Sequence, residues 1–224
     1  MKKIASIHTA QPDKFGIPRQ SGLVPELRGR IIFEPEYRSP DALRGIEGFS
    51  HIWLIWGFSQ NATDKWSPTV RPPRLGGDVR MGVFATRSPF RPNPIGLSCV
   101  KLEAVRMGKD GPELEVSGTD MADKTPIYDI KPYLPYTDSR PEASGGFAAP
   151  YIDYALEVSV SHELMDKIPP EHRAALIGIL SNDPRPSYHN DGERVYGLTF
   201  AGFNIKFTVL GRTLTVHEIT GHCI

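Results

Sequence analysis

The residues best suited to chemistry lie in one run, FATRSPFRPNPIGLS, at positions 84–98. In this run Arg87 and Arg91 alternate with Phe90, and three prolines fix the backbone and bias the residues before them away from helix. A guanidinium group can pair bidentately with a carboxylate or phosphate, and an aromatic face can stack on a purine or a cation. We therefore interpret residues 84–98, hereafter the ledge, as a stiff ligand-binding segment. The alternative is a rigid proline-rich loop with solvated arginines.

A second set of titratable side chains follows in the motif DIKPY at 129–133. On a strand, Asp129, Lys131 and Tyr133 share one face, because side chains alternate between faces. They are the candidates for moving a proton in a reaction. They could equally form a surface salt bridge beside a packed tyrosine.

Other kinds of site are not indicated. The sequence contains neither G-x-G-x-x-G after a strand nor a P-loop, and no serine lies in G-x-S-x-G. His217 and His222 are five residues apart at a strand end, whereas a zincin places them four apart on a helix, so we expect no metal. No residue set indicates nucleophilic catalysis.

The charge is unevenly distributed along the 224 residues. The chain is neutral overall, but residues 1–140 carry +4 and residues 141–224 carry −4. Between positions 65 and 91 six basic residues accompany a single acid, which fits phosphate contact or a solvated face. With two cysteines, no leader-like apolar segment and no apolar run near the ~20 residues of a membrane span, we expect a cytoplasmic protein.

Short β patterns joined by Pro/Gly-rich turns dominate the first part of the chain. We expect strands over 4–8, 30–33, 51–58, 81–86, 95–105, 113–117 and 126–131, and a brief helix over 40–44 capped by Ser39. This pattern is typical of a mainly β protein with an antiparallel β-barrel rather than a βαβ fold.

The last part of the chain predicts a separate, smaller α+β domain. A strand over 154–161, a helix over 169–181 and a hairpin of 204–209 with 214–219 follow a segment rich in Pro, Ser, Gly and Ala. We therefore expect a barrel domain at 1–140, a linker at 141–153 and a C-terminal domain at 154–224.

The ledge resembles the signature of the TrmO family, the TsaA-like S-adenosylmethionine-dependent tRNA methyltransferases. Further stretches resemble the family in its order, namely residues 15–23 (FGIPRQSGL), 45–53 (GIEGFSHIW), 71–77 (RPPRLGG), 81–84 (MGVF) and 120–133 (DMADKTPIYDIKPY). Residues 183–188 (DPRPSY) look like the appended domain of the longer bacterial members. Ser59 departs from the family's usual His and Lys124 from its usual Gly. The first departure bears on one cofactor contact and the second on the turn, because glycine tolerates positive φ.

The resemblance implies a cofactor, S-adenosylmethionine, and the residues that hold it. Those residues are Pro18, Arg19, Gln20, Ser59, Gln60, Arg87, Leu97, Asp123, Lys124, Thr125 and Pro126.

The resemblance also implies a tRNA partner that binds through its anticodon loop. The implied reaction is methylation of N6 of threonylcarbamoyl-adenosine at position 37, and the implied oligomeric state is a homodimer. The RNA-binding candidates are Arg71, Arg74, Arg80, Phe90 and Arg91. The rival interpretation is a non-catalytic barrel that binds a nucleotide-like ligand or RNA.

Overall fold

Six antiparallel strands close into a barrel in the computed structural model, which describes residues 1–61, 66–72, 75, 79–151, 154–185 and 191–221. Around the barrel the order is β1, β2, β7, β6, β3, β8, and β8 pairs with β1 to close it. The strands are β1 (Ala5–Thr9), β2 (Arg28–Phe33), β3 (His51–Gly57), β6 (Ile95–Gly108), β7 (Gly111–Ser117) and β8 (Thr125–Pro132). The predicted antiparallel barrel is confirmed.

Alternation of apolar side chains places the barrel core. On β3, Ile52, Leu54 and Trp56 point inward and are buried, whereas Trp53 on the other face is half-buried. Because side chains of a strand alternate between faces, every second residue of a regular strand faces the interior. The inward residues of the other strands, such as Ile7, Ile31 and Ile127, complete this core.

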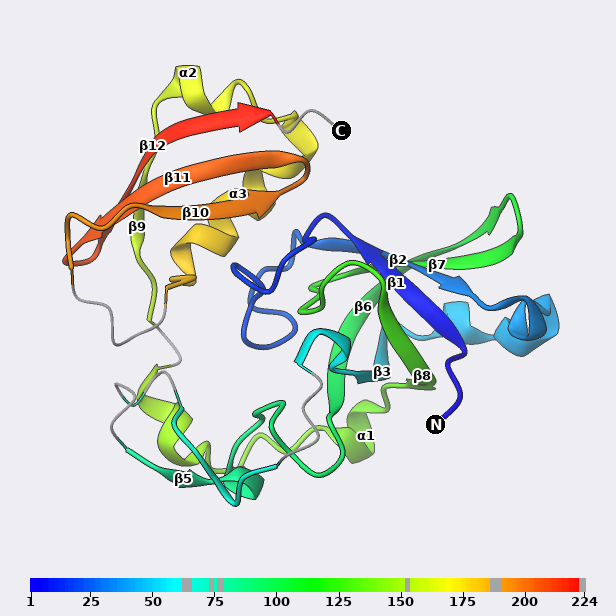
Figure 1. The fold of residues 1–224 in the computed structure, drawn as a ribbon. Coiled ribbons are helices and arrows are strands. Elements are labelled where there is room, and N and C mark those ends of the chain that lie inside the picture. The colour runs from blue at the N-terminus through cyan, green and yellow to red at the C-terminus, as the bar shows by residue number, and fades with distance from the viewer. Residues whose placement is uncertain (62–65, 73–74, 76–78, 152–153, 186–190, 222–224) are drawn as a thin grey trace.

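A second sheet lies beside the barrel, in the order β10, β11, β12, β9 (Figure 1). Its strands are β9 (Glu157–Ser159), β10 (Tyr196–Phe200), β11 (Phe203–Leu210) and β12 (Thr213–Gly221), accompanied by the helices α2 (His162–Met165) and α3 (Pro170–Ser181). We call residues 154–185 and 191–221 the C-terminal unit. Its core also contains Val24 and Leu27, which come from the segment between β1 and β2.

The remaining short elements belong neither to the barrel nor to the C-terminal sheet. They are the 3₁₀ turns η1 (Pro35–Tyr37), η2 (Pro40–Leu43), η3 (Ile46–Gly48), η4 (Ser59–Asn61), η6 (Val83–Ala85) and η7 (Gly146–Tyr151), the hairpin β4 (Thr69–Val70) with β5 (Met81–Gly82), and helix α1 (Pro135–Asp138). In Figure 1 the β4–β5 hairpin and the segment around residue 146 lie together, away from the barrel. We call the segment between β3 and β6, residues 58–94, the excursion.

Several predicted elements are shorter than expected or of another kind. The strand predicted over 81–86 ends at Gly82, because the amide and hydroxyl of Thr86 both donate to the carbonyl of Val83 and form a 3₁₀ turn. Ser39 precedes the 3₁₀ turn η2, and its carbonyl accepts from the amide of Ala42, but its side chain makes no capping hydrogen bond.

In the C-terminal unit the strand predicted over 154–161 is reduced to β9. On one side of β9, the amide of Leu156 donates to the carbonyl of Ser181 at the end of α3. On the other side, Ser161 caps α2 by accepting from the amide of Leu164. Strand β10 was not predicted.

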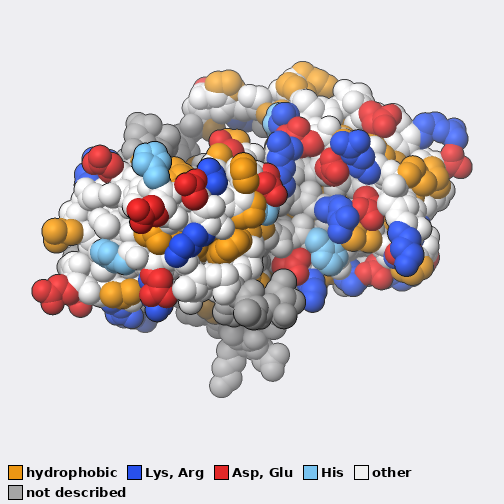
Figure 2. Space-filling model, turned by 90° about the horizontal axis from the view of Figure 1, so that it is seen from above, with side chains coloured by type: hydrophobic (Ala, Val, Ile, Leu, Met, Phe, Trp, Pro, Cys, Tyr) orange, Lys and Arg blue, Asp and Glu red, His pale blue; other side chains and the backbone are white. Residues whose placement is uncertain are grey.

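Charges of both signs are interspersed on the face in Figure 2. On the barrel wall, charged side chains of neighbouring strands form ion pairs, such as Arg30 with Glu113 and Arg106 with Glu115. In the part of the chain that is described, no helix combines the length and apolarity needed to cross a membrane.

Candidate active site

A cavity of about 1800 Å³ opens at one end of the barrel, where β3 ends and β6 and β8 begin. Described residues of the excursion form one wall, and the segment between β1 and β2, residues 10–27, forms another. We call residues 10–27 the first loop. Residues 144–148, inside the segment predicted to be a linker, complete the lining.

The ledge lies along this cavity and is braced by its own arginine. Arg91 Nη1 donates to the carbonyls of Thr86 at 2.8 Å and Ser88 at 3.5 Å. Its guanidinium lies 5.9 Å from the ring centroid of Phe84. Arg91 therefore holds the ledge in shape, whereas the exposed rings of Phe84 and Phe90 remain available to a ligand.

Arg87 connects the ledge to the first loop. Its Nη1 donates to Oε1 of Gln20, so two residues that are 67 positions apart meet at the cavity. Gln60 connects a third segment, because its Nε2 donates to the carbonyl of Pro12 at 3.3 Å and its own carbonyl accepts from Lys14. Three predicted cofactor segments are thus joined through side chains.

The C-terminal unit is hydrogen-bonded to the first loop. Arg19 Nη2 donates to the carbonyl of Arg185 at 3.2 Å. Arg185 in turn binds the carboxylate of Asp183 through Nε at 2.8 Å and Nη2 at 2.9 Å, and the Tyr154 hydroxyl donates to the same carboxylate at 2.9 Å. Burial alone would raise the pKa of Asp183, but these donors outweigh it and lower the pKa.

One carboxylate lines the cavity at the barrel end. Ser98 Oγ donates to Asp120 Oδ1 at 2.6 Å, and Trp56 Nε1 donates to the same Ser98 oxygen at 2.9 Å. Burial raises the pKa of Asp120 to about 6, against the opposing effects of the Ser98 hydrogen bond, backbone donors and the Arg87 charge. The sequence reasoning did not select Asp120, Ser98 or Trp56. The available signal was that Asp120 is the first residue of the same 120–133 motif that supplied other candidates.

Most of the predicted cofactor residues meet at this cavity. Its lining includes Pro18, Arg19, Gln20, Ser59, Gln60, Arg87, Leu97 and Thr125.

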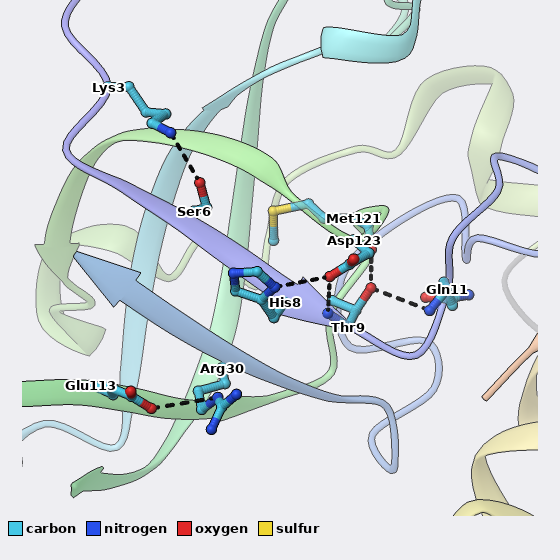
Figure 3. Close-up of polar contacts among 9 residues, drawn as sticks. All are labelled: Lys3, Ser6, His8, Thr9, Gln11, Arg30, Glu113, Met121 and Asp123. Carbon is cyan, nitrogen blue, oxygen red and sulfur yellow. Dashed lines mark hydrogen bonds and ion pairs between the residues drawn. The ribbon is translucent and has the colours of Figure 1, made fainter. Parts of the chain in front are cut away.

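Asp123, Lys124 and Pro126 are not among the lining residues. Asp123 Oδ1 accepts from the amide of Thr9 at 3.1 Å and lies 3.3 Å from His8 Nδ1, so this carboxylate holds the end of β1 (Figure 3). Lys124 has φ of 62°, which is the left-handed region that favours glycine, the residue that the family resemblance predicts there. Their assignment to the cofactor remains a prediction.

The three residues predicted to move a proton lie elsewhere on the barrel. Lys131 Nζ is 3.0 Å from Asp129 Oδ2 in a solvent-exposed ion pair, and Tyr133 packs against Trp53 with ring centroids 5.8 Å apart. None of them lines the cavity. A proton acceptor must be within hydrogen-bond reach of the reacting group, so the geometry favours the surface alternative for this set.

The nearby indole is fixed by a further carboxylate. Trp53 Nε1 and the amide of Leu134 both donate to Asp138 Oδ2 at 2.9 Å. The backbone donor and the indole lower the pKa of Asp138. Tyr133 therefore packs against an indole that is itself held by a hydrogen bond to Asp138.

The predicted RNA-binding residues gather around the same cavity. Arg71, Arg80, Phe90 and Arg91 line it, and the exposed ring of Trp66 joins them. Arg74 lies outside the described residues. Arg80 Nη1 donates to Thr69 Oγ1 at 2.8 Å, which fixes its side chain across the β4–β5 hairpin.

Within the described ranges, no three His, Cys, Asp or Glu side chains are grouped so that they could hold a metal ion. His217 Nε2 instead contacts Thr208 Oγ1 at 2.8 Å, and His222 is outside those ranges.

Comparison with known proteins covers both parts of the chain. Residues 6–139 match the model of the tRNA-methyltransferase O N-terminal domain, and residues 153–222 match that of the TrmO C-terminal domain. The tRNA (adenine(37)-N6)-methyltransferase of Escherichia coli K12 is 42% identical over 216 residues, which cover 93% of this chain and 92% of that protein. A Pseudomonas aeruginosa relative, 41% identical over 87% of this chain and 86% of its own length, has a name that classes it among S-adenosylmethionine-dependent methyltransferases.

Solved structures agree with the sequence comparison. A crystal structure of TrmO from Pseudomonas aeruginosa superposes with a TM-score of 0.76 at 31% identity, covering 98% of this chain and 97% of that one.

Proposed function

The chain belongs to the TrmO family of tRNA methyltransferases, and we propose that it methylates N6 of adenine 37 in tRNA, with S-adenosylmethionine as methyl donor. The observation that carries this proposal is the likeness to a tRNA (adenine(37)-N6)-methyltransferase along nearly the whole of both chains. The cavity supports it, because eight of the eleven predicted cofactor residues line it together with four of the five predicted RNA-binding residues.

The cavity residues fit S-adenosylmethionine by their chemistry. Arg87 supplies a guanidinium for the methionine carboxylate, and it is already oriented by Gln20. The aromatic side chains of Trp56 and Phe58, packed with centroids 4.4 Å apart, offer apolar surface to the adenine or the sulfonium methyl. When bound, the sulfonium supplies an activated methyl group, so the protein has chiefly to align donor and acceptor.

The second substrate is proposed to be the tRNA anticodon loop with threonylcarbamoyl-adenine at position 37. The guanidinium groups of Arg71 and Arg80 line the cavity and suit phosphate contact, and the exposed rings of Trp66, Phe84 and Phe90 suit unstacked bases. A carbamoylated N6 is a weak nucleophile because its lone pair is conjugated on both sides. Alignment and help with its proton are therefore what the site must provide.

We also propose a cytoplasmic homodimer in which the C-terminal unit helps to position tRNA. The domain boundaries at 140 and 153 belong to this proposal.

The test is nucleoside mass spectrometry of tRNA from cells with and without the gene, together with reconstitution using purified protein. We expect N6-methyl-threonylcarbamoyl-adenosine to disappear with the gene and to return when purified protein and S-adenosylmethionine are added to that tRNA. Binding of the cofactor without methyl transfer to any tRNA would instead establish the non-catalytic barrel.

A further inference from the structure

The cavity holds a single acid among many cations. Its described lining includes six lysine and arginine side chains, and Asp120 is the one carboxylate among those lining residues. A surface built only to bind a polyanion gains nothing from a carboxylate, which repels phosphate. Asp120 therefore calls for a role other than holding the RNA backbone.

Asp120 is also held more firmly than a surface acid. Its Oδ1 accepts from Ser98 Oγ at 2.6 Å, and Ser98 is oriented by the indole of Trp56 at 2.9 Å. Ser98 and Trp56 are 1% and 7% exposed and come from two paired strands. The backbone of Gly96 lies against the Trp56 ring, where any side chain at that position would collide with the indole. The carboxylate thus has a fixed position and a partner for one oxygen.

We propose that Asp120 is the group that accepts the proton lost from N6 of adenine 37 during methyl transfer, an inference that rests on the proposed function. N6 forms a bond to the methyl carbon, the electrons of the carbon–sulfur bond leave with sulfur, and the N6 hydrogen passes as a proton to the Asp120 carboxylate. Ser98 and Trp56 are positioning residues, because they fix the carboxylate.

The electrostatics of the site suit a proton acceptor. Burial raises the pKa of Asp120 to about 6, so the group is ionised at neutral pH and is a stronger base than an ordinary aspartate. The described groups that oppose this shift are the Ser98 hydroxyl on β6, the backbone amides of Ser21 and Asp120 itself, and the Arg87 guanidinium from the ledge. Asp129, the competing candidate, is paired with Lys131 on the exposed barrel wall.

The test is single-turnover methylation between pH 5 and 9, with methyl-labelled S-adenosylmethionine and tRNA that carries unmethylated threonylcarbamoyl-adenine 37. We expect the wild-type rate to rise through pH about 6 and then level off. Asp120→Asn should be about a hundredfold slower above pH 7 and should lose this rise. Ser98→Ala removes a donor to the ionised form, so its rise should move to higher pH.

Two readouts do not depend on turnover. Cofactor affinity by calorimetry should stay within about threefold of wild type in Asp120→Asn. Infrared difference spectra should show a carboxyl group that titrates near pH 6 in wild type and is absent from Asp120→Asn. The matched control is Glu103→Gln, which alters another serine-bound carboxylate, 2.7 Å from Ser117 Oγ and outside the cavity lining, and should leave rate and profile unchanged.

The outcomes separate the inference from the proposed function. A wild-type protein that transfers no methyl to this tRNA would overturn both. An active wild type with an equally active Asp120→Asn would overturn the role of Asp120 alone, as would a hundredfold loss in Asp129→Asn with no loss in Asp120→Asn. Should Asp120→Asn fail to fold, an unmoved pH profile in Ser98→Ala would decide against the inference.

Discussion

Arg19 in the first loop donates a hydrogen bond to the backbone carbonyl of Arg185, 166 positions later, at 3.2 Å. Arg185 is itself fixed by Asp183, whose carboxylate binds both its Nε and its Nη2. Of the two residues that meet, one lines the cavity and the other belongs to the C-terminal unit. The geometry of the first loop therefore depends on the C-terminal unit.

The first prediction concerns this link. Asp183→Asn should lower the free energy of unfolding by about 2–4 kcal/mol, because it leaves the buried Arg185 charge without its carboxylate. It should also weaken S-adenosylmethionine binding through Arg19. Thermal unfolding and calorimetry measure the two effects.

The pH dependence of this loss has a definite sign. Since the folded-state pKa of Asp183 is lowered, its contribution is present at neutral pH and disappears as the pH falls through that lowered pKa. The stability difference between wild type and Asp183→Asn should therefore shrink in acid. Asp191→Asn, an exposed substitution in the same unit, is the control; if it destabilises as much, the buried pair is not the cause.

The second prediction separates backbone strain from contact in the first loop. Gly16 and Gly22 have φ of +91° and +79°, so alanine is strained at both. Only at Gly16 would the new methyl collide with a neighbour, Leu198 of the C-terminal unit. We expect Gly16→Ala to destabilise by about 1–3 kcal/mol more than Gly22→Ala in chemical denaturation. Equal losses would mean that Leu198 does not pack against this turn.

The third prediction is a pH-dependent gain in stability from Asp120→Asn. The folded-state pKa of Asp120, about 6, exceeds the ordinary 3.8, so folding favours the protonated form and stability falls as the pH rises from 4 to 6. The substitution removes this penalty, and its relative gain between pH 4 and pH 7.5 should be up to about 3 kcal/mol. The stability difference between wild type and Asp120→Asn at pH 4 is the reference for the difference at pH 7.5. A difference that does not change with pH would contradict the raised pKa.

The fourth prediction divides the ledge by function. Arg87→Ala should weaken S-adenosylmethionine binding about tenfold to a hundredfold, by the loss of a charge-assisted pair. Arg91→Ala should chiefly weaken tRNA binding. It removes the hydrogen bonds to the carbonyls of Thr86 and Ser88, so the ledge that carries the rings of Phe84 and Phe90 becomes less rigid. Calorimetry with cofactor and filter binding with tRNA measure the two constants. If each substitution affects both ligands equally, the ledge acts as one unit.

The barrel was predictable because its signals are local. Alternation on β3 and the turn at 109–110 between β6 and β7 specify inward faces and one hairpin directly from residue order. The family resemblance then selected segments that do meet at the cavity, such as Gln20 with Arg87.

What escaped prediction depends on tertiary contacts. Asp120 is distinguished from Asp123 only by what surrounds it, since Asp123 is turned to the end of β1 and Asp120 to Ser98. The composition of residues 144–148 predicted a linker, yet these residues line the cavity together with described residues of the excursion. Asp129 and Lys131 of the DIKPY motif were correctly predicted to lie on one face of their strand. The residue order does not specify whether that face is close to the cavity, because this depends on how the strands close into the barrel.

The shared core has a consequence for how the protein is made. Val24 and Leu27 leave the ribosome early, whereas Leu198, Phe200 and Phe207, with which they form one core, are translated about 170 residues or more afterwards. At a synthesis rate of about 5–20 residues per second, roughly ten to thirty seconds pass between synthesis of the first loop and synthesis of the residues that pack against it. All six barrel strands are complete well before that, at Pro132. During synthesis the barrel can thus close while the segment that carries Pro18, Arg19 and Gln20 is still unsupported, and the cavity that this segment lines is among the last parts of the nascent chain to take shape.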